Sequence, residues 1–423
     1  MSMYPKKKNR AEYQIIFLLI FLYISVLLGF ILSENSSGGA FLDYVNQKQI
    51  TGFFANNFLF TFLNYDDYTT RHSPVLLIAL SFFERVQLDD YLIRLIYFHI
   101  CLILPISFFY ILKLKFKDQQ LEIKYLLILV GLIFLSPIFR SLSIWPDSRL
   151  IGLTFFTTSI LFFLKFIEKK KTSFIFLNII FYTISSYFSP NFAVFSIYFV
   201  YKYFRFLGIS SLKFYIIIIF NLLLAFPALY YVLILDINFF NKSAAIGLGG
   251  SDKIFFTNIF NQILIIPSII FFYFLPFYST KILGIKKLIN YKNFIITLII
   301  FTLSLFYFDY KPEYSGGGII FKLSDYFFSN NILFFIFSFI SIMFVLGIIS
   351  DKIDNLLILF LLFISNPQIT IYHKYYDPLL IVMFFSLFML NVRLEYLKNF
   401  KKVLILYLYF FGFLLANILK SYI

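Results

Sequence analysis

The chain has 423 residues, of which 61% are hydrophobic and only 13% are charged, and its net charge is +15. Soluble globular domains carry a charged fraction nearer a quarter, so this composition excludes a soluble protein and indicates a polytopic membrane protein. The positive charge does not indicate a nucleic-acid partner. The cations lie in short runs between apolar segments, as the positive-inside rule describes for cytoplasmic loops.

Apolar runs recur from residue 14 to the end of the chain. A membrane-spanning helix needs about 17–25 mainly apolar residues to cross roughly 30 Å of hydrocarbon. We therefore predict an all-α fold, a polytopic helical bundle of about 11–13 spans that forms one integral membrane domain over residues 1–423, with no soluble domain. The predicted spans are 14–33, 91–112, 122–139, 150–167, 173–188, 191–206, 212–235, 257–279, 293–309, 331–350, 355–366, 378–391 and 403–420.

The first apolar run fixes the expected orientation. It follows a basic stretch that contains Lys6, Lys7, Lys8 and Arg10, and it is longer than the core of a typical signal peptide. We interpret it as a retained span with a cytoplasmic N-terminus. Later basic segments such as EKKK (168–171) then fall on the cytoplasmic side. We expect a bacterial inner or plasma membrane, with most acidic residues on the outer face.

Residues 34–90 form the first outer loop, which contains the longest polar segment between predicted spans. Asp43 follows Gly38-Gly39 close to the membrane, so its placement suits a general base. The alternative is that Asp43 caps a surface helix over residues 44–62. The run 75–86 is too short to span, and we predict a helix lying on the outer surface, with Pro74 in its first turn.

Arg71 and His72 precede this helix and could bind a phosphate through charge-assisted hydrogen bonds. A structural alternative is that Arg71 pairs with Asp66 or Asp67.

The outer loop FRSLSIWPDSR (139–149) is a second candidate. It places Arg140, Asp147 and Arg149 close together, and two arginines beside an acid suit a lipid phosphate. Its Trp145, the only tryptophan of the chain, is interpreted as an anchor at the membrane interface.

A late segment, NPQITIYHKYYDPL (366–379), adds His373, Lys374 and Asp377, although an interfacial tyrosine belt would explain its composition equally well. The glycine run in YSGGGIIFKLSDYF (314–327) is interpreted as flexible, and it is weak evidence for nucleotide binding because no P-loop lysine follows.

The remaining reactive side chains indicate no metal chemistry. His99 lies within a predicted span and is interpreted as a satisfied core histidine. The three histidines lack zinc-ligand spacing, and the single Cys101 cannot form an intrachain disulfide. No metal site and no cofactor are expected.

The order of these motifs resembles the GT-C superfamily of membrane glycosyltransferases that use polyprenyl-phosphate sugars, such as mannosyltransferases and aminoarabinose transferases. The resemblance covers roughly the first 170 residues. It rests on an outer loop with Asp43, the H-S-P motif at His72, an Arg-led span at Arg94 and the Trp-Pro-Asp-Ser-Arg loop. Asp43 is followed by Tyr44, whereas the family usually has an adjacent acid pair.

The resemblance implies a function and a set of site residues. Asp43 would take the position of the base, Asp147 that of the second acid, and outer basic residues would hold the donor phosphate, among them Arg71, Arg140, Arg149 and His373. The implied activity is inverting transfer of a sugar on the outer face to a glycan, lipid or protein acceptor of the cell envelope.

Two other classes remain open from the sequence. An outer-face polysaccharide polymerase or ligase would also carry arginine-bearing outer loops, but it would place its largest loop late in the chain. A lipid-linked sugar flippase or other transporter would need charged residues in its spans, and apart from His99 the centres of these spans have none.

Overall fold

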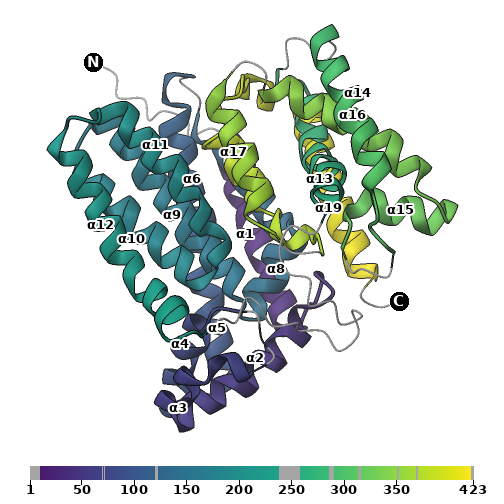
Figure 1. Cartoon of the computed structure of the whole chain (residues 1–423). Helices are drawn as coiled ribbons and strands as arrows, with labels where there is room; N and C mark the ends of the chain where they lie inside the picture. The colour runs from purple at the N-terminus through teal and green to yellow at the C-terminus, as the bar shows by residue number, and fades with distance from the viewer. Residues whose placement is uncertain are drawn as a thin grey trace, which may run out of the picture.

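The computed structural model describes residues 10–68, 70, 72–119, 122–237, 258–284, 290–312, 316–349, 352–367 and 370–420. Helices dominate these residues, and the only extended pairing among them is an isolated bridge between Leu283 and Val392 (Figure 1). The predicted all-α bundle is therefore confirmed.

Six helical stretches are long and apolar enough to cross a membrane. They are α1 (Arg10–Ile31), α5 with α6 (Asp90–Cys101 and Ile103–Lys115), α9 (Ser148–Lys169), α12 with the π-turn η5 (Leu212–Leu229 and Tyr230–Ile234), α13 (Ile259–Ser279) and α19 (Phe400–Lys420). A seventh candidate is a bent pair, in which α7 (Ile123–Gly131) and η3 (Leu132–Leu135) meet α8 (Pro137–Ile144) at 64°. These helices support a multi-pass membrane protein.

Shorter apolar helices complete the bundle. They are α10 (Ser173–Phe188), α14 (Tyr291–Tyr307), α16 (Ile332–Ile349) and α17 (Ile353–Ile364), together with α11 (Ser196–Leu207), which follows the 3-10 turn η4 (Pro190–Phe195). The interior lies around α9 and α13, whereas α12 and α19 direct most of their apolar side chains outward. Outward-facing leucines such as Leu222 and Leu223 fit contact with lipid.

The predicted helical span over 378–391 is wrong. Helix α18 (Leu379–Phe385) has only seven residues, and the chain then turns toward Val392. The segment from Leu379 to Phe388 is buried inside the protein. Its apolar composition therefore reflects burial against other helices. Irregular backbone at such depth is tolerated where protein covers it.

The described residues between α1 and α5 fold into a small helical unit at one end of the bundle (Figure 1). It consists of α2 (Ala40–Asn56), α3 (Phe58–Leu63), the 3-10 turn η1 (Tyr65–Asp67) and α4 (Pro74–Arg85). Helix α4 matches the predicted short helix: Ser73 caps it and Pro74 occupies its first turn. The expected single helix over 44–62 is instead two helices, broken at Asn57.

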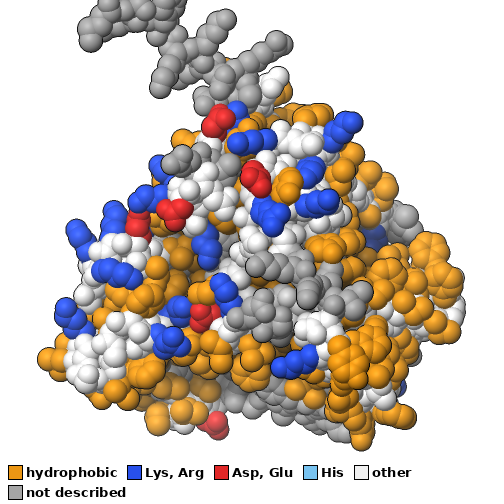
Figure 2. Space-filling view, turned by 90° about the horizontal axis from the view of Figure 1, so that it is seen from above, with side chains coloured by type: hydrophobic (Ala, Val, Ile, Leu, Met, Phe, Trp, Pro, Cys, Tyr) orange, Lys and Arg blue, Asp and Glu red, His pale blue; other side chains and the backbone are white. Residues whose placement is uncertain are grey.

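Figure 2 looks onto the opposite end of the bundle, where lysine and arginine side chains gather and acids are few. Ion pairs join segments that are far apart in the chain. Lys117 pairs with Glu168 at 2.9 Å, and Lys202 pairs with Asp354 at 3.0 Å. Such a concentration of cations is typical of a cytoplasmic surface.

Candidate functional site

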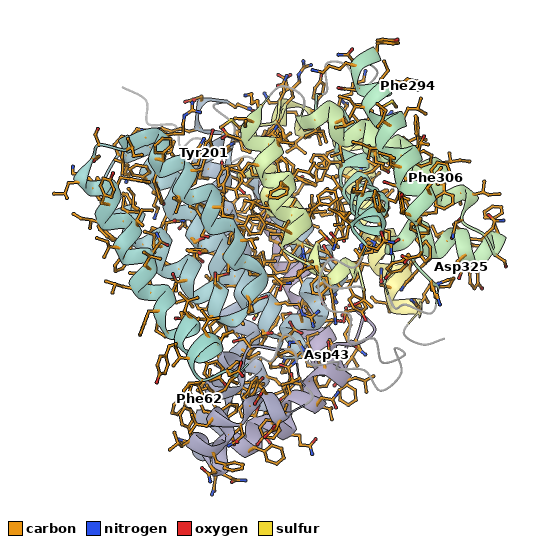
Figure 3. All side chains as sticks on the ribbon, in the orientation of Figure 1. Asp43, Phe62, Tyr201, Phe294, Phe306 and Asp325 are labelled. Carbon is orange, nitrogen blue, oxygen red and sulfur yellow. The ribbon has the colours of Figure 1, made fainter. Side chains whose placement is uncertain are left out.

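Three segments from distant parts of the chain meet around the Asp43 carboxylate. Asp43 lies in the first turn of α2, and Figure 3 labels it near the start of that helix. Its Oδ2 accepts a hydrogen bond from Lys374 Nζ at 3.0 Å and lies 3.4 Å from Arg149 Nη2. Lys374 belongs to the 3-10 turn η6 (His373–Tyr375), and Arg149 to the start of α9.

The cap interpretation of Asp43 is wrong. Helix α2 begins at Ala40 with Gly39 at its N-cap, so Asp43 is already inside the helix, and its carboxylate faces the two cations. An acid in the first turn still interacts favourably with the helix dipole. The position therefore fits both a stable helix and a carboxylate available for chemistry.

Asp147 holds Arg149 in place from the preceding turn. Asp147 caps α9: its Oδ1 accepts from the Arg149 backbone N–H at 2.7 Å and lies 3.4 Å from the Arg149 Nε. The Tyr97 hydroxyl fixes the Asp147 backbone by donating to its carbonyl at 2.7 Å. Asp147 Oδ2 and Arg149 Nη1 are buried and have no hydrogen-bond partner in the described part of the chain. Both groups therefore retain capacity for a ligand.

His72 lies on the other side of this cluster. Its Nδ1 is 3.1 Å from the Ser148 hydroxyl, and its backbone carbonyl accepts from the Tyr65 hydroxyl at 2.8 Å. The neighbouring Ser73 hydroxyl donates to the Tyr187 carbonyl and so ties the start of α4 to α10. Burial and the nearby Arg149 lower the pKa of His72 to about 4, so its imidazole is neutral at physiological pH.

Burial and the neighbouring charges together set the pKa values of Asp43, Lys374 and Tyr375. Burial alone would raise the pKa of Asp43, but Lys374 and Arg149 offset this effect, so that its pKa lies below the ordinary value. Burial and Arg149 lower the pKa of Lys374, while Asp43 acts in the opposite direction. The Tyr375 ring lies 5.3 Å from the Arg149 guanidinium, and burial raises the pKa of its hydroxyl to about 12. Asp43 is therefore an ionised carboxylate at neutral pH.

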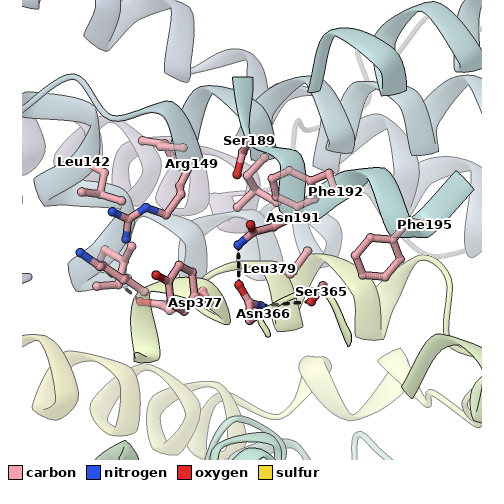
Figure 4. A pocket seen from close by; sticks show the side chains of 15 residues that line it. Leu142, Arg149, Ser189, Asn191, Phe192, Phe195, Ser365, Asn366, Asp377 and Leu379 are labelled. Atoms are coloured by element: carbon pink, nitrogen blue, oxygen red, sulfur yellow. Dashed lines mark hydrogen bonds between the residues drawn. The ribbon is translucent and has the colours of Figure 1, made fainter. Parts of the chain in front are cut away.

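A cavity opens beside these cations (Figure 4). Arg149, Lys374 and Asp377 line one part of it. Its other walls combine apolar and aromatic side chains, including Leu153, Phe192 and Phe195, with the amides of Asn191 and Asn366. An apolar pocket with a few polar groups and charges is the usual form of a small-molecule site.

Asp377 is buried at the break between η3 and α8. Its Oδ2 accepts from the Ser136 hydroxyl at 2.7 Å and lies 3.5 Å from the Ile138 backbone nitrogen. Burial raises the pKa of Asp377 to about 7. The carboxyl group therefore fastens the segment that carries Lys374 to the start of α8.

The triple glycine holds the same segment from the other side. Gly316, Gly317 and Gly318 all have positive φ angles, and the Gly317 N–H donates to the Ile371 carbonyl at 2.9 Å. A Cβ on Gly316 would come within 2.6 Å of the Ile371 oxygen. The glycine run was interpreted as flexible. Gly316 to Gly318 instead form a tight turn that packs against the backbone of Ile371.

Two of the predicted phosphate ligands lie apart from the cluster. Arg140 bonds to the Glu34 carboxylate through Nε at 2.8 Å and Nη2 at 2.5 Å, and to Ser25 through Nη1 at 2.9 Å. His373 is buried, and its Nε2 accepts from the Ile319 N–H at 3.0 Å. Burial lowers the pKa of His373 to about 3, so the ring is neutral. Arg71 lies outside the described residues.

Two further sequence interpretations need correction. Trp145 is buried rather than interfacial: its indole N–H donates to the Glu34 carbonyl at 3.0 Å, and the Arg94 guanidinium lies 3.7 Å from its ring. His99 is satisfied by contacts with Tyr23 and the Leu95 carbonyl, as expected, but it lies at the surface of the bundle. Cys101 is buried, as expected of a packing residue.

Sequence reasoning missed Asn191, Asn366 and Ser148. Asn and Ser are common in loops, and no local pattern marks those that face a cavity. Within the described ranges, no group of three or more His, Cys, Asp or Glu side chains could hold a metal ion.

Comparisons with known proteins give no family. No family model matches the chain, and no curated protein is significantly similar to it. A function must therefore be argued from the geometry of the site.

Proposed function

We propose that this protein is a membrane glycosyltransferase that moves a sugar from a polyprenyl-phosphate donor to a hydroxyl group of a glycan, lipid or protein acceptor. The observation that carries the proposal is the meeting of Asp43 with Lys374 and Arg149 beside an apolar cavity. A lipid-linked phosphate needs cations, an acceptor hydroxyl needs a base, and a lipid chain needs access from the membrane.

The proposed reaction is a single displacement. The acceptor oxygen forms a bond to the anomeric carbon while the bond from that carbon to the phosphate oxygen breaks. The acceptor proton passes to the Asp43 carboxylate, and the polyprenyl phosphate leaves with the electron pair. Lys374 and Arg149 stabilise the charge that develops on the leaving phosphate. The configuration at the anomeric carbon is inverted.

The supporting residues have defined tasks in this scheme. Asp147 orients Arg149 through its capping and side-chain contacts, and Tyr375 lies against the guanidinium. The neutral His72 can accept or donate a hydrogen bond without adding charge. Asp377 positions the segment that carries Lys374. In this scheme Lys374 and Arg149 take the place of a metal ion in neutralising the leaving phosphate.

The proposed orientation follows the distribution of charge. The cationic end shown in Figure 2 would face the cytoplasm, and the end with Asp43 would face the periplasm or an equivalent outer compartment. We propose a bacterial inner or plasma membrane as its location.

The test is transfer from radiolabelled polyprenyl-phosphate sugars in proteoliposomes. Asp43→Asn keeps the shape of the side chain and removes its basicity, so kcat/KM should fall by about a hundredfold or more. Asp90→Asn on α5 is a control, since it alters an acid outside the cluster. Full transfer by Asp43→Asn would exclude Asp43 as the base. Movement of labelled lipid across the bilayer without transfer to any acceptor would instead indicate a flippase.

A further inference from the structure

We propose that the cavity beside Arg149 and Lys374 holds the sugar of the donor, and that the amides of Asn191 and Asn366 recognise its hydroxyl groups. The inference rests on the proposed function and deepens it, because it assigns the two ends of the donor to two parts of one cavity. The phosphate would lie at the cations and the sugar between the amides.

The two amides meet across the cavity, as the dashed line in Figure 4 shows. Asn191 lies on η4 and Asn366 just after the end of α17, and Asn191 Nδ2 donates to Asn366 Oδ1 at 2.5 Å. Asn366 is fixed from behind: its Nδ2 donates to the Ser365 hydroxyl at 3.1 Å, and its carbonyl accepts from Gln262 Nε2 at 3.3 Å. The pair thus joins two elements that are separated by 175 positions in the chain.

The composition of the cavity favours a sugar over a lipid tail. Ser189 and Ser365 add hydroxyl groups to the two amides, and Phe192 and Phe195 add aromatic surface. An isoprenoid chain offers no hydrogen bonds, so polar groups facing it would be a cost. A sugar carries hydroxyl groups that both donate and accept, together with apolar C–H faces that can pack on aromatic rings.

The contact between the amides gives the cavity two states. With no sugar present, the Asn191 amide N–H and the Asn366 amide oxygen satisfy each other. Separation of the pair would free a donor on Asn191 and an acceptor on Asn366, and sugar hydroxyl groups could replace the bond that is lost. Burial of an amide is tolerated only while its hydrogen bonds are made, so the exchange of partners is what permits entry. Asn191 is partly exposed and Asn366 is buried, so Asn191 is the side chain that can move.

The experiment compares binding of lipids with and without a sugar. The probes are undecaprenyl phosphate and the same lipid carrying mannose, glucose, galactose or aminoarabinose, titrated against the full chain in nanodiscs. We expect the wild-type protein to bind at least one glycosylated lipid about tenfold more tightly than the bare lipid phosphate, as one or two extra hydrogen bonds imply.

The variants are Asn366→Leu and Asn191→Leu, which keep the approximate volume and remove the hydrogen bonds. Both should bind the bare and the glycosylated lipid equally. Retained affinity for undecaprenyl phosphate shows that a variant is folded and that Arg149 and Lys374 are intact. Asn221→Leu, on the outward-facing α12, is the matched control, because Asn221 bonds only to the Ile217 carbonyl of its own helix; it should keep the wild-type preference.

The outcomes separate the two proposals. If wild-type protein binds undecaprenyl phosphate but prefers none of the glycosylated lipids, or if both leucine variants keep the preference, the sugar subsite is wrong. Tighter binding of the bare lipid by the leucine variants would assign the cavity to the lipid tail. If wild-type protein does not bind undecaprenyl phosphate at all, both the proposed function and the subsite fail.

Discussion

Arg140 on α8 and Arg149 on α9 each face a carboxylate from the part of the chain that follows α1, yet their surroundings differ. Arg140 uses all three of its guanidinium nitrogens for Glu34 and Ser25 at 2.5–3.1 Å. Arg149 contacts Asp43 and Asp147 at 3.4 Å, and its Nη1 has no partner among the described residues. The first arginine is saturated by the protein, whereas the second retains capacity to bind.

This difference separates a saturated ion pair from one that retains an unused donor, which we propose binds the donor phosphate. The two pairs are parallel, since each joins residues 106 positions apart: Glu34, just after α1, contacts Arg140 on α8, and Asp43 in α2 contacts Arg149 on α9. The Glu34 pair fixes the two segments together, and Trp145 adds a bond to the Glu34 carbonyl. The Asp43 pair can then remain loose beside the cavity.

The largest expected effect is on the free energy of unfolding when the ion pair between Glu34 and Arg140 is broken. Arg140→Met leaves the Glu34 carboxylate buried without its partner, which should reduce the free energy of unfolding by about 3–5 kcal/mol. Thermal unfolding in nanodiscs, followed by the fluorescence of the single Trp145, measures the loss. Replacing both partners, Glu34→Met with Arg140→Met, should recover most of the stability, because no charge remains buried. An unchanged midpoint in the single variant would contradict a structural role.

A change at Arg149, which pairs with Asp43, should affect donor binding rather than stability. Arg149→Lys keeps the charge but loses the planar fork that binds a phosphate through two hydrogen bonds, so KM for the lipid donor should rise by about tenfold. The unfolding midpoint should change little. Transfer kinetics at varied donor concentration measure the effect. If Arg149→Lys unfolded at a much lower temperature with KM unchanged, the distinction between the two arginines would be wrong.

Part of this arrangement could be predicted from the sequence. Apolar length identified most helices, because a buried or lipid-covered helix must be apolar over its length. Ser73-Pro74 indicated the start of α4. The outer loops were expected to lie on one side of the membrane, so candidates such as Asp43, Asp147 and Lys374 could be placed on one face, although their contacts could not be predicted.

Other features depend on partners that are distant in sequence. Nothing near Arg140 shows that Glu34 will saturate it, and the adjacent His373 and Lys374 point to different surroundings. The segment 378–391 was mistaken for a helical span because burial in protein and burial in lipid select the same apolar residues. Asn191 and Asn366 acquire a possible role only through their contact across the cavity.

Glu34 and Asp43 each pair with an arginine, whereas the carboxyl group of Asp377 bonds to Ser136 and the Ile138 backbone. Its pKa is raised from 3.8 to about 7, so the folded state retains a proton that the unfolded state has already lost. Stability should therefore decrease as pH rises from about 4 to about 7 and then level off. Asp377→Asn cannot ionise and should reduce this dependence by at least about 1.4 kcal/mol, the value of one pKa unit. Unfolding midpoints of both proteins across this pH range measure the difference. Parallel curves would contradict a buried, protonated Asp377.

The smallest effect on stability is expected for an exposed ion pair between α2, the helix that carries Asp43, and α5. Lys48 Nζ lies 2.6 Å from Asp90 Oδ1, but the two side chains are 45% and 33% exposed. Asp90 also accepts from the Tyr44 hydroxyl at 2.5 Å, so removal of the lysine does not leave it without a partner.

Lys48→Ala should therefore reduce stability by less than about 1 kcal/mol, and added salt should make the difference smaller. Transfer should remain near the wild-type rate, because the carboxylate of Asp43 keeps both of its cations. Unfolding midpoints at low and high salt, measured with transfer rates, test this expectation. A loss of transfer as large as that of Asp43→Asn would show that the attachment of α2 to α5, rather than the chemistry of the Asp43 carboxylate, limits the reaction.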